Sequence, residues 1–356
     1  MKKLLIFIIS ILLVCFCVYG TYHYMLGSPS DKDLILEFDV EKGSTYSSIA
    51  ESLEKEKFIK NALCYKIYLK LNPVDDTLEY GRYYLPTNAT VEELIEVLKK
   101  GSDTVAETKT VTFVEGKNMR YIISTIKENF GISEKDILNK LKNKDYLDKL
   151  ISKYWFINED IKDSKLYYSL EGYLYPDTYE FYDNASIEDI FSKMLDNMES
   201  KLESYKEEIQ NSKYSIHEML TLASIIELEA GNASDRKGVA GVFYNRLNDK
   251  WSLGSDVTTY YAEKIDNFSR DLKQSELDKC NQYNTRNSCM AGKLPVGPIC
   301  NPGLESIIAS IEPKNHDYYY FVADKNGKTY FSKTDAEHVN TVARLKREGL
   351  WIEYEE

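Results

Sequence analysis

The sequence predicts an α+β fold, made of a small αβ module followed by a larger mixed domain with a helical centre. A strand, a turn and a helix follow one another at residues 34–53, and the same pattern returns at residues 111–126. Residues 132–211 have the spacing of charged, amphipathic helices, and residues 318–331 have that of a hairpin. A parallel doubly wound sheet is therefore not expected.

The composition indicates a folded protein that does not act on nucleic acid. The 356 residues are 43% hydrophobic, which is enough for two domains with cores of their own. A net charge of -12 argues against a nucleic-acid backbone as the main partner. The 29 tyrosines suit sugar binding, although any single one is as often an ordinary core or surface residue.

The amino terminus has the pattern of a membrane segment. Lys2 and Lys3 precede an uncharged apolar run at residues 4–18, and no charge follows before Asp31. A cleaved signal peptide is the alternative, but no Ala-x-Ala-like site follows the apolar run. We predict that residues 1–27 form a short cytoplasmic end and one transmembrane helix, with the rest of the chain outside the cytoplasm.

The cysteine and histidine spacings do not indicate a metal site. Cys280 and Cys289 could close a small loop in an oxidising compartment, but the sequence cannot fix how they, Cys64 and Cys300 pair. Their spacings are not those of a zinc ribbon, and the four histidines are scattered. We predict neither a metal ion nor another cofactor.

The small module begins with the first of the two strand-turn-helix units. Residues 34–40 alternate as a strand, Gly43 marks the turn, and Ser44 is placed to cap a helix. Aligning Gly43 with Gly116 also aligns apolar helix positions of the two units, namely Ile49 with Ile122 and Leu53 with Ile126. A further strand and an amphipathic helix are expected between the units, at residues 78–86 and 90–99.

A segment rich in glycine, proline and aromatic residues interrupts the charged helices. Residues 170–181 read LEGYLYPDTYEF. By local chemistry alone they form a packed turn in which Pro176 and Asp177 set the bend.

Residues 221–247 carry the most unusual charges. They begin as an apolar helix, yet Glu227 and Glu229 lie in it with no Lys or Arg nearby before Arg236. At helical spacing at least one of these glutamates lies against apolar packing, which raises the pKa of a carboxyl and suits it to donate a proton near neutral pH. A position at the solvent edge is the alternative. Gly231 fits a left-handed residue after the helix, and the next helix is expected to be capped by Asn232 or Ser234.

A last helix follows the predicted hairpin. Thr334 and Glu337 have the spacing of a capping box. The residues expected to face inward from this helix are Val339, Val342 and Leu345.

These motifs resemble the YceG-like endolytic murein transglycosylases, a family of membrane-anchored enzymes that cut the glycan strands of peptidoglycan. The segment ASIIELEAGNASDRKGVAGVFYNRL is similar to the active-site region of that family, in which the first glutamate of the run is catalytic. The resemblance assigns this role to Glu227. LEGYLYPDTYEF matches the family's LEGYLFPDTYEF almost letter for letter, so Glu171 and Tyr179 become candidates for lining the substrate groove.

Further segments match the family with a few departures. LGSDVTTYY is similar to a Leu-Gln-Ser-Asp-Pro-Thr-like segment, except at Gly254 and Val257. YNT matches the start of the family's YNTY, with Arg286 in place of the last tyrosine, and residues 292–303 match its loop rich in glycine and proline. The resemblance implies substrate-binding roles for Ser255, Asp256, Thr258, Tyr283, Asn284 and Thr285.

The resemblance also implies a domain order. Residues 28–104 resemble a LysM-like module and residues 105–356 a YceG-like catalytic domain, within which residues 105–135 are a candidate for a second LysM-like unit. Such units commonly bind glycans that contain N-acetylglucosamine, so the module is expected to tether substrate. A small αβ spacer without affinity of its own is the alternative.

The implied reaction uses one carboxyl group twice. Glu227 would protonate the glycosidic oxygen between N-acetylmuramic acid (MurNAc) and N-acetylglucosamine (GlcNAc), and would then accept the proton of the C6 hydroxyl that closes a 1,6-anhydro ring. A hydrolase would need a second carboxylate, which Asp256 or Glu171 could supply. Dipoles for the oxocarbenium-like transition state are expected from Asn284, Thr285 and Ser255.

Two other functions stay open from sequence alone. One is a membrane-anchored scaffold that binds the cell wall without turnover, and the other is a muramidase that adds water. Peptidoglycan strands, the cytoplasmic membrane and wall-synthesis enzymes are the expected partners. The expected location is the cell membrane, with the catalytic domain outside the cytoplasm.

Overall fold

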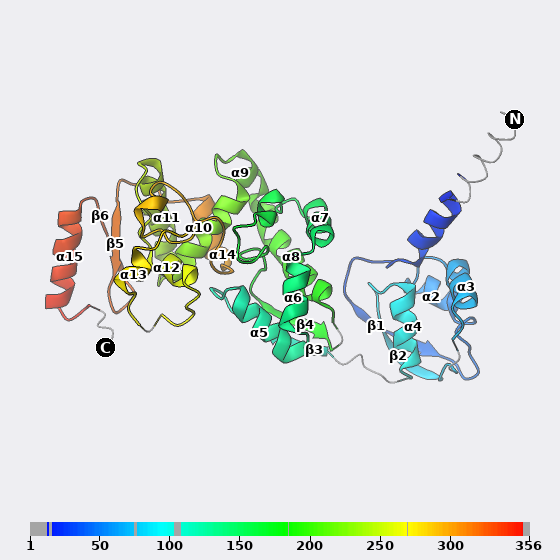
Figure 1. The fold of residues 1–356 in the computed structure, drawn as a ribbon. Coiled ribbons are helices and arrows are strands. Elements are labelled where there is room, and N and C mark those ends of the chain that lie inside the picture. Colours follow the sequence, from blue (N-terminus) through cyan, green and yellow to red (C-terminus); the bar gives the residue numbers. More distant parts are fainter. Residues whose placement is uncertain are drawn as a thin grey trace, which may run out of the picture. The chain divides into compact units, whose positions relative to one another are not determined.

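The computed structural model describes residue 13 and residues 16–74, 77–102, 108–183, 185–268 and 270–351. The chain divides into two compact units, Met1–Lys109 and Thr110–Glu356. Figure 1 shows many helices and a few short strands, and the described strands form two-stranded sheets. The architecture is the mixed α+β one that the sequence predicts.

The first unit is built on a two-stranded sheet. Strand β1 (Ile35–Val40) pairs antiparallel with β2 (Gly81–Pro86), and the unit also contains α2 (Ala50–Lys55), α3 (Ala62–Leu71) and α4 (Val91–Lys99). Residues 16–26, which precede the sheet, are helical as well. Because side chains alternate along a strand, each strand buries one face. The buried strand residues share a core with the helices, formed by Phe38, Val40, Tyr83 and Leu85 with Leu53, Tyr65, Leu94 and Leu98.

Helices α2 and α4 begin in different ways. Thr90 caps α4, since its hydroxyl accepts a hydrogen bond from Glu93 N at 3.3 Å and its N–H donates to Glu93 Oε2 at 2.7 Å. The prediction that Ser44 caps α2 is wrong, because the helix begins later. Thr45 and Ser48 each accept a hydrogen bond from the other's backbone N–H, which holds this stretch as a turn.

The second unit opens with the repeated pattern and continues with helices. Strand β3 (Thr108–Thr112) and helix α5 (Met119–Phe130) are followed by α6 (Glu134–Leu141), α7 (Lys144–Lys153), α8 (Ile187–Leu202) and α9 (Lys206–Asn211), with 3-10 turns at Glu159–Lys162 and Glu203–Tyr205. Residues 170–181 contain more than the expected turn. Their last part is strand β4 (Thr178–Tyr182), which pairs with β3.

Helix α10 (Ile216–Glu229) is buried on almost every side. It begins with a capping box made by Ser215 and Glu218, and it packs against α14 (Leu304–Ile311) and α11 (Arg236–Asn248). Residues 219–226 are all buried, whereas Glu227 and Glu229 in the last turn are partly exposed. The two glutamates therefore lie at the end of a helix whose body is enclosed by the protein.

The turn after α10 corrects two predictions. Gly231 does not have a positive φ, so it is not a left-handed cap. A 3-10 turn at Ala233–Asp235 leads into α11, and neither Asn232 nor Ser234 caps a helix through its side chain. Asn232 instead donates a hydrogen bond to Gly327 O in the distant hairpin turn, so tertiary contact replaces the local cap.

The end of the second unit follows the predicted order. Its elements are α12 (Asp256–Ala262), α13 (Gln274–Leu277), a 3-10 turn (Ser288–Met290), the hairpin β5 (Tyr320–Ala323) and β6 (Thr329–Ser332), and α15 (Asp335–Arg347). Thr334 accepts a hydrogen bond from Glu337 N at 3.2 Å, but the Glu337 side chain bonds Lys333 N, so only half of the capping box forms. Leu345 is buried, whereas Val339 is 55% exposed and does not face inward as predicted.

Most of the apolar core of the predicted membrane segment lies outside the described residues. Within the part of the chain that the structure describes, no helix combines the length and the apolar character needed to cross a membrane.

Candidate active site

Glu227 is held by donors from two other segments. Its Oε2 accepts hydrogen bonds from Ser306 Oγ at 2.6 Å and from Gly303 N at 3.2 Å. Its Oε1 lies 3.3 Å from Arg236 Nη2, and only 7% of the side chain is exposed. These contacts fix the direction of the carboxylate.

Two of these donors lie at the N-terminus of α14. Gly303 is the N-cap residue of that helix and has no side chain to cap it, and Ser306 lies in the first turn. The first backbone N–H groups of a helix lack partners within the helix and carry partial positive charge. Glu227 therefore caps α14 from a neighbouring helix, and the end of α14 provides a favourable environment for its negative charge.

Glu229 points to different neighbours. Its Oε1 accepts a hydrogen bond from Ser255 Oγ at 2.6 Å. Burial raises the pKa of the Glu229 carboxyl and the charge of Asp256 adds to this, while Arg246 and Arg286 oppose it. The raised pKa expected for at least one of the two helix glutamates is thus found at Glu229.

Glu115, which was not predicted as a site residue, lies beside Glu227. It belongs to the turn between β3 and α5, and its carboxyl group packs on Gly303. Partial burial and the charge of Glu227 raise the pKa of the Glu115 carboxyl, and Arg236 opposes this rise. The repeated strand-turn-helix pattern was the signal that marked this turn.

Glu171 is enclosed within the second unit, with 2% of its surface exposed. Its carboxyl group accepts hydrogen bonds from Met119 N at 3.0 Å, Tyr261 OH at 2.9 Å and Asn301 Nδ2 at 3.2 Å. Burial raises its pKa to about 7. Asn301 Oδ1 also accepts from Gly172 N at 3.0 Å, so Glu171 and Asn301 connect the LEGYLYPDTYEF segment to α5 and to the loop before α14.

The polar residues after α11 form one buried network. Thr258 and Thr285 share a hydrogen bond of 2.8 Å between their hydroxyls, and Ser255 N donates to Thr285 Oγ1 at 3.1 Å. Asn284 accepts from Thr259 Oγ1 at 2.7 Å and donates to three backbone carbonyls, those of Glu276, Leu277 and Lys279. These contacts shape the loops, and a direct contact with substrate stays a prediction.

Two predicted tyrosines are also buried. Tyr179 OH donates to Tyr175 O at 2.6 Å, and Tyr283 OH accepts from Tyr167 N at 3.2 Å.

Asp256 is the exposed member of the predicted set, and its carboxylate lies 3.2 Å from Arg286 Nε. Arg286, the residue at which the sequence departs from the expected YNTY pattern, is thus the ion-pair partner of Asp256.

A disulfide joins Cys280 to Cys289 and closes the loop that contains Asn284. This is one of the pairings that the sequence left open. Cys300 is a buried free thiol whose Sγ lies 3.3 Å from Ser224 O.

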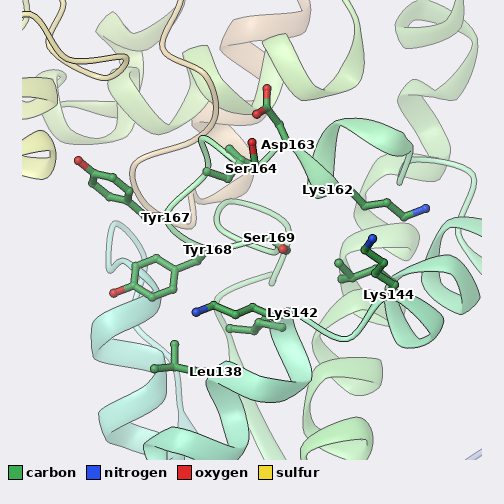
Figure 2. Close-up of a pocket in the computed structure, with 12 residues that line it drawn as sticks. Leu138, Lys142, Lys144, Lys162, Asp163, Ser164, Tyr167, Tyr168 and Ser169 are labelled. Atoms are coloured by element: carbon green, nitrogen blue, oxygen red, sulfur yellow. The ribbon is translucent and has the colours of Figure 1, made fainter.

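A separate cavity of about 280 Å³ lies beside α6 and α7. Figure 2 shows lysine, tyrosine and serine side chains around it, among them Lys142, Lys144, Tyr168 and Ser169. None of the predicted site residues lines this cavity. It therefore has no part in the arrangement around Glu227.

Together the fold and the site define a mixed α+β protein with a donor-held carboxylate at the end of a buried helix. The chain belongs to the YceG-like family, whose model matches residues 38–344. Its resemblance to that family extends over most of the sequence.

Known relatives support this assignment. An endolytic murein transglycosylase of Bacillus subtilis is 34% identical over 321 residues, which are 89% of this chain and 87% of the relative. One of Streptococcus pneumoniae is 31% identical over 340 residues, which are 91% of this chain but only 62% of the relative. A crystal structure of a YceG-like protein from Listeria monocytogenes has a TM-score of 0.60 and 33% identity, and covers 87% of this chain and 100% of that one.

Proposed function

We propose that this chain is an endolytic lytic transglycosylase that cleaves the β-1,4 bond from MurNAc to GlcNAc in peptidoglycan. Membership of the YceG-like family and relatives named endolytic murein transglycosylase support the proposal. The structural observation that carries it is the Glu227 carboxylate, which is oriented by Ser306, Gly303 and Arg236. A group used for proton transfer must be held in one direction, and these contacts do so.

The reaction proceeds in two proton transfers at one residue. Glu227 gives its proton to the glycosidic oxygen as the bond from that oxygen to C1 of MurNAc breaks. The C6 hydroxyl oxygen of the same sugar then bonds to C1 while its proton passes to Glu227, which leaves a 1,6-anhydro-MurNAc end and restores the enzyme. Ser306 Oγ and Gly303 N meet the negative charge that Glu227 carries between the two transfers.

The remaining predicted residues serve substrate binding in this proposal. Asp256 and Arg286 form an exposed, charged pair that can contact sugar hydroxyls. Ser255, Thr258, Tyr283, Asn284 and Thr285 are buried, so they contribute by fixing the loops that carry this pair. Glu171 and Tyr179 act in the same way on the segment from residue 170 to 181.

The rest of the chain brings the enzyme to its substrate. We assign residues 28–104 to a LysM-like module that tethers glycan and residues 105–356 to the catalytic domain. Support for tethering comes from a cavity in the first unit, lined among others by Gly43, Thr45, Tyr46 and Leu78. Residues 1–27 are proposed to anchor the chain in the cell membrane with the catalytic domain outside, where it meets nascent strands and wall-synthesis enzymes.

Analysis of the reaction products tests the proposal. Purified protein is incubated with un-cross-linked glycan strands, and the new ends are identified by mass spectrometry after borohydride treatment. Anhydro ends support a transglycosylase, and reducible MurNAc ends identify a muramidase. Binding of strands without any new ends would identify a scaffold and would contradict the proposal.

A further inference from the structure

The turn formed by Glu115, Gly116 and Lys117 is fastened to the loop that leads into α14. Gly116 N donates to Asn301 O at 2.9 Å, and Asn301 N donates to Lys117 O at 2.9 Å. Gly116 has a φ of 71°, and a Cβ on it would lie 3.5 Å from Glu227 Cγ. The turn therefore packs directly on the side chain of the proposed catalytic residue.

Glu115 reaches the same glycine that binds Glu227. A Cβ on Gly303 would lie only 2.5 Å from Glu115 Cδ, so the Glu115 carboxyl group occupies the space that the missing side chain leaves. Gly303 N, on the same residue, donates to Glu227 Oε2 at 3.2 Å. The two carboxyl groups thus flank one residue at the N-terminus of α14.

The two carboxyl groups have different surroundings. Glu227 has three donors and is almost buried. Glu115 is exposed, and no residue in the described part of the chain donates a hydrogen bond to its carboxylate or forms an ion pair with it. Arg236, the nearby cation, is bonded to Glu227. An accessible carboxylate without a partner is therefore placed beside the proposed acid.

Such a carboxylate favours the transition state over the bound substrate. The glycosidic oxygen and C1 carry little charge in the substrate, but C1 and its ring oxygen become positive as the bond breaks. A fixed negative charge near that position gains an attraction only at this stage, which lowers the barrier. The pKa of Glu115 is raised first by its partial burial and second by the charge of Glu227.

We propose that Glu115 is a second catalytic residue of this centre, whose carboxylate faces the reacting MurNAc ring and stabilises the positive charge at C1. The assignment rests on the proposed transglycosylase function. Glu115 neither donates nor accepts a proton in this scheme, so Glu227 still performs both transfers.

The test compares Glu115→Gln with the matched control Glu305→Gln. Glu305 is exposed in the first turn of α14 and its charge also acts on Glu115, but among the described residues it forms no hydrogen bond with Glu227. Glu115→Gln is expected to lower kcat by roughly 10-fold to 100-fold with little change in KM, because the lost attraction exists only in the transition state. The control is expected to stay near the wild-type kcat.

The pH profile adds a readout that a purely structural role would not move. Glu227, Arg236, Asp177 and Glu305 are the charged groups that act on Glu115. Only the ionised form of Glu115 can stabilise the positive charge at C1. The wild-type kcat therefore falls at low pH partly because Glu115 becomes protonated. Glu115→Gln has no such group to protonate, so this part of the pH dependence is lost. Glu115→Asp keeps the charge and is expected to recover part of the lost kcat.

A second variant moves the Glu115 carboxylate away from Gly303 without changing any charge. Gly303→Ala has an allowed backbone conformation, at φ -74° and ψ 167°, but its Cβ displaces the Glu115 carboxyl group. It is expected to reproduce the loss of kcat seen in Glu115→Gln while the products keep anhydro ends. If Glu115→Gln folds poorly, Gly303→Ala still tests the role of Glu115.

Two results would overturn the assignment. One is a wild-type kcat and pH profile in Glu115→Gln, and the other is a wild-type kcat in Gly303→Ala with Glu115 displaced in its crystal structure. A wild-type enzyme that makes no anhydro ends would instead contradict the proposed function, so the two failures can be told apart.

Discussion

Ser306 Oγ donates a hydrogen bond of 2.6 Å to Glu227 Oε2 and so joins the last turn of α10 to the first turn of α14. The two residues are 79 positions apart in the sequence. Both helices are well packed against each other, so the carboxylate is supported by rigid elements. This contact is what turns a glutamate at a helix end into an oriented functional group.

Replacing Ser306 with alanine tests that contact. Ser306→Ala leaves Gly303 N and Arg236 as donors to Glu227, so we expect kcat to fall by about 10-fold, below the roughly 100-fold to 1,000-fold loss of a main transition-state donor. Ser310→Ala is the matched control, because Ser310 Oγ lies in the same helix and donates a hydrogen bond to Ile307 O at 2.8 Å instead of to Glu227. Equal kcat values for the two variants would argue against a role for the contact with Ser306.

The raised pKa of buried Glu171 should make the stability of the protein depend on pH. Its pKa in the folded chain is about 7, above the ordinary 4.5, so the unfolded chain loses the proton first as pH rises. Its stabilising contribution is complete below about pH 4.5 and is lost as pH rises through about 7, which costs on the order of 3 kcal/mol in unfolding free energy. Glu171→Gln cannot titrate. Urea unfolding at pH 5 and pH 8 should show a smaller difference for this variant, and equal differences would contradict the assignment.

Removing the disulfide is expected to lower the stability of the protein but not its catalytic activity. Replacing both Cys280 and Cys289 with serine removes a cross-link over 9 residues, which is expected to cost about 2 to 3 kcal/mol. Asn284 still bonds the carbonyls of Glu276, Leu277 and Lys279, so the loop keeps its shape and activity should stay largely intact. A folded double variant without activity would show that this reasoning is wrong.

Helices and strands could be predicted where the sequence has both a periodic pattern of apolar residues and capping or turn residues at the ends. Helix α4 has inward positions at helical spacing and a capping box at Thr90, and the hairpin of β5 and β6 has its turn residues. Strand β4 was missed because its partner β3 lies far away in the sequence, and pairing stabilises so short a strand. The same reason explains Asn232, whose partner Gly327 is in another element.

The site could be predicted only in part. The family motif indicated Glu227, but its donors Gly303 and Ser306 come from another helix, and no spacing rule connects them. The burial of Thr258 and Thr285 could not be read from the sequence either, because hydroxyl groups can satisfy each other in the interior. Glu115 lay in a recognised turn, yet only the fold places that turn against α10.

The two glutamates of α10 allow the most direct test of the central claim. Glu227 bonds Ser306 and Gly303, whereas Glu229 bonds Ser255, so the two side chains can be changed separately. Glu227→Gln keeps the size of the side chain but cannot cycle a proton, and general acid-base catalysis contributes roughly 100-fold to 10,000-fold in rate. Glu229→Gln should lose far less.

The decisive measurement is the rate at which each variant forms anhydro ends on glycan strands, with folding checked by circular dichroism. We expect folded Glu227→Gln to bind strands and form essentially no anhydro ends, while Glu229→Gln forms them at a rate close to that of the wild type. An active Glu227→Gln beside an inactive Glu229→Gln would reverse the assignment, and two active variants would place the catalytic acid elsewhere.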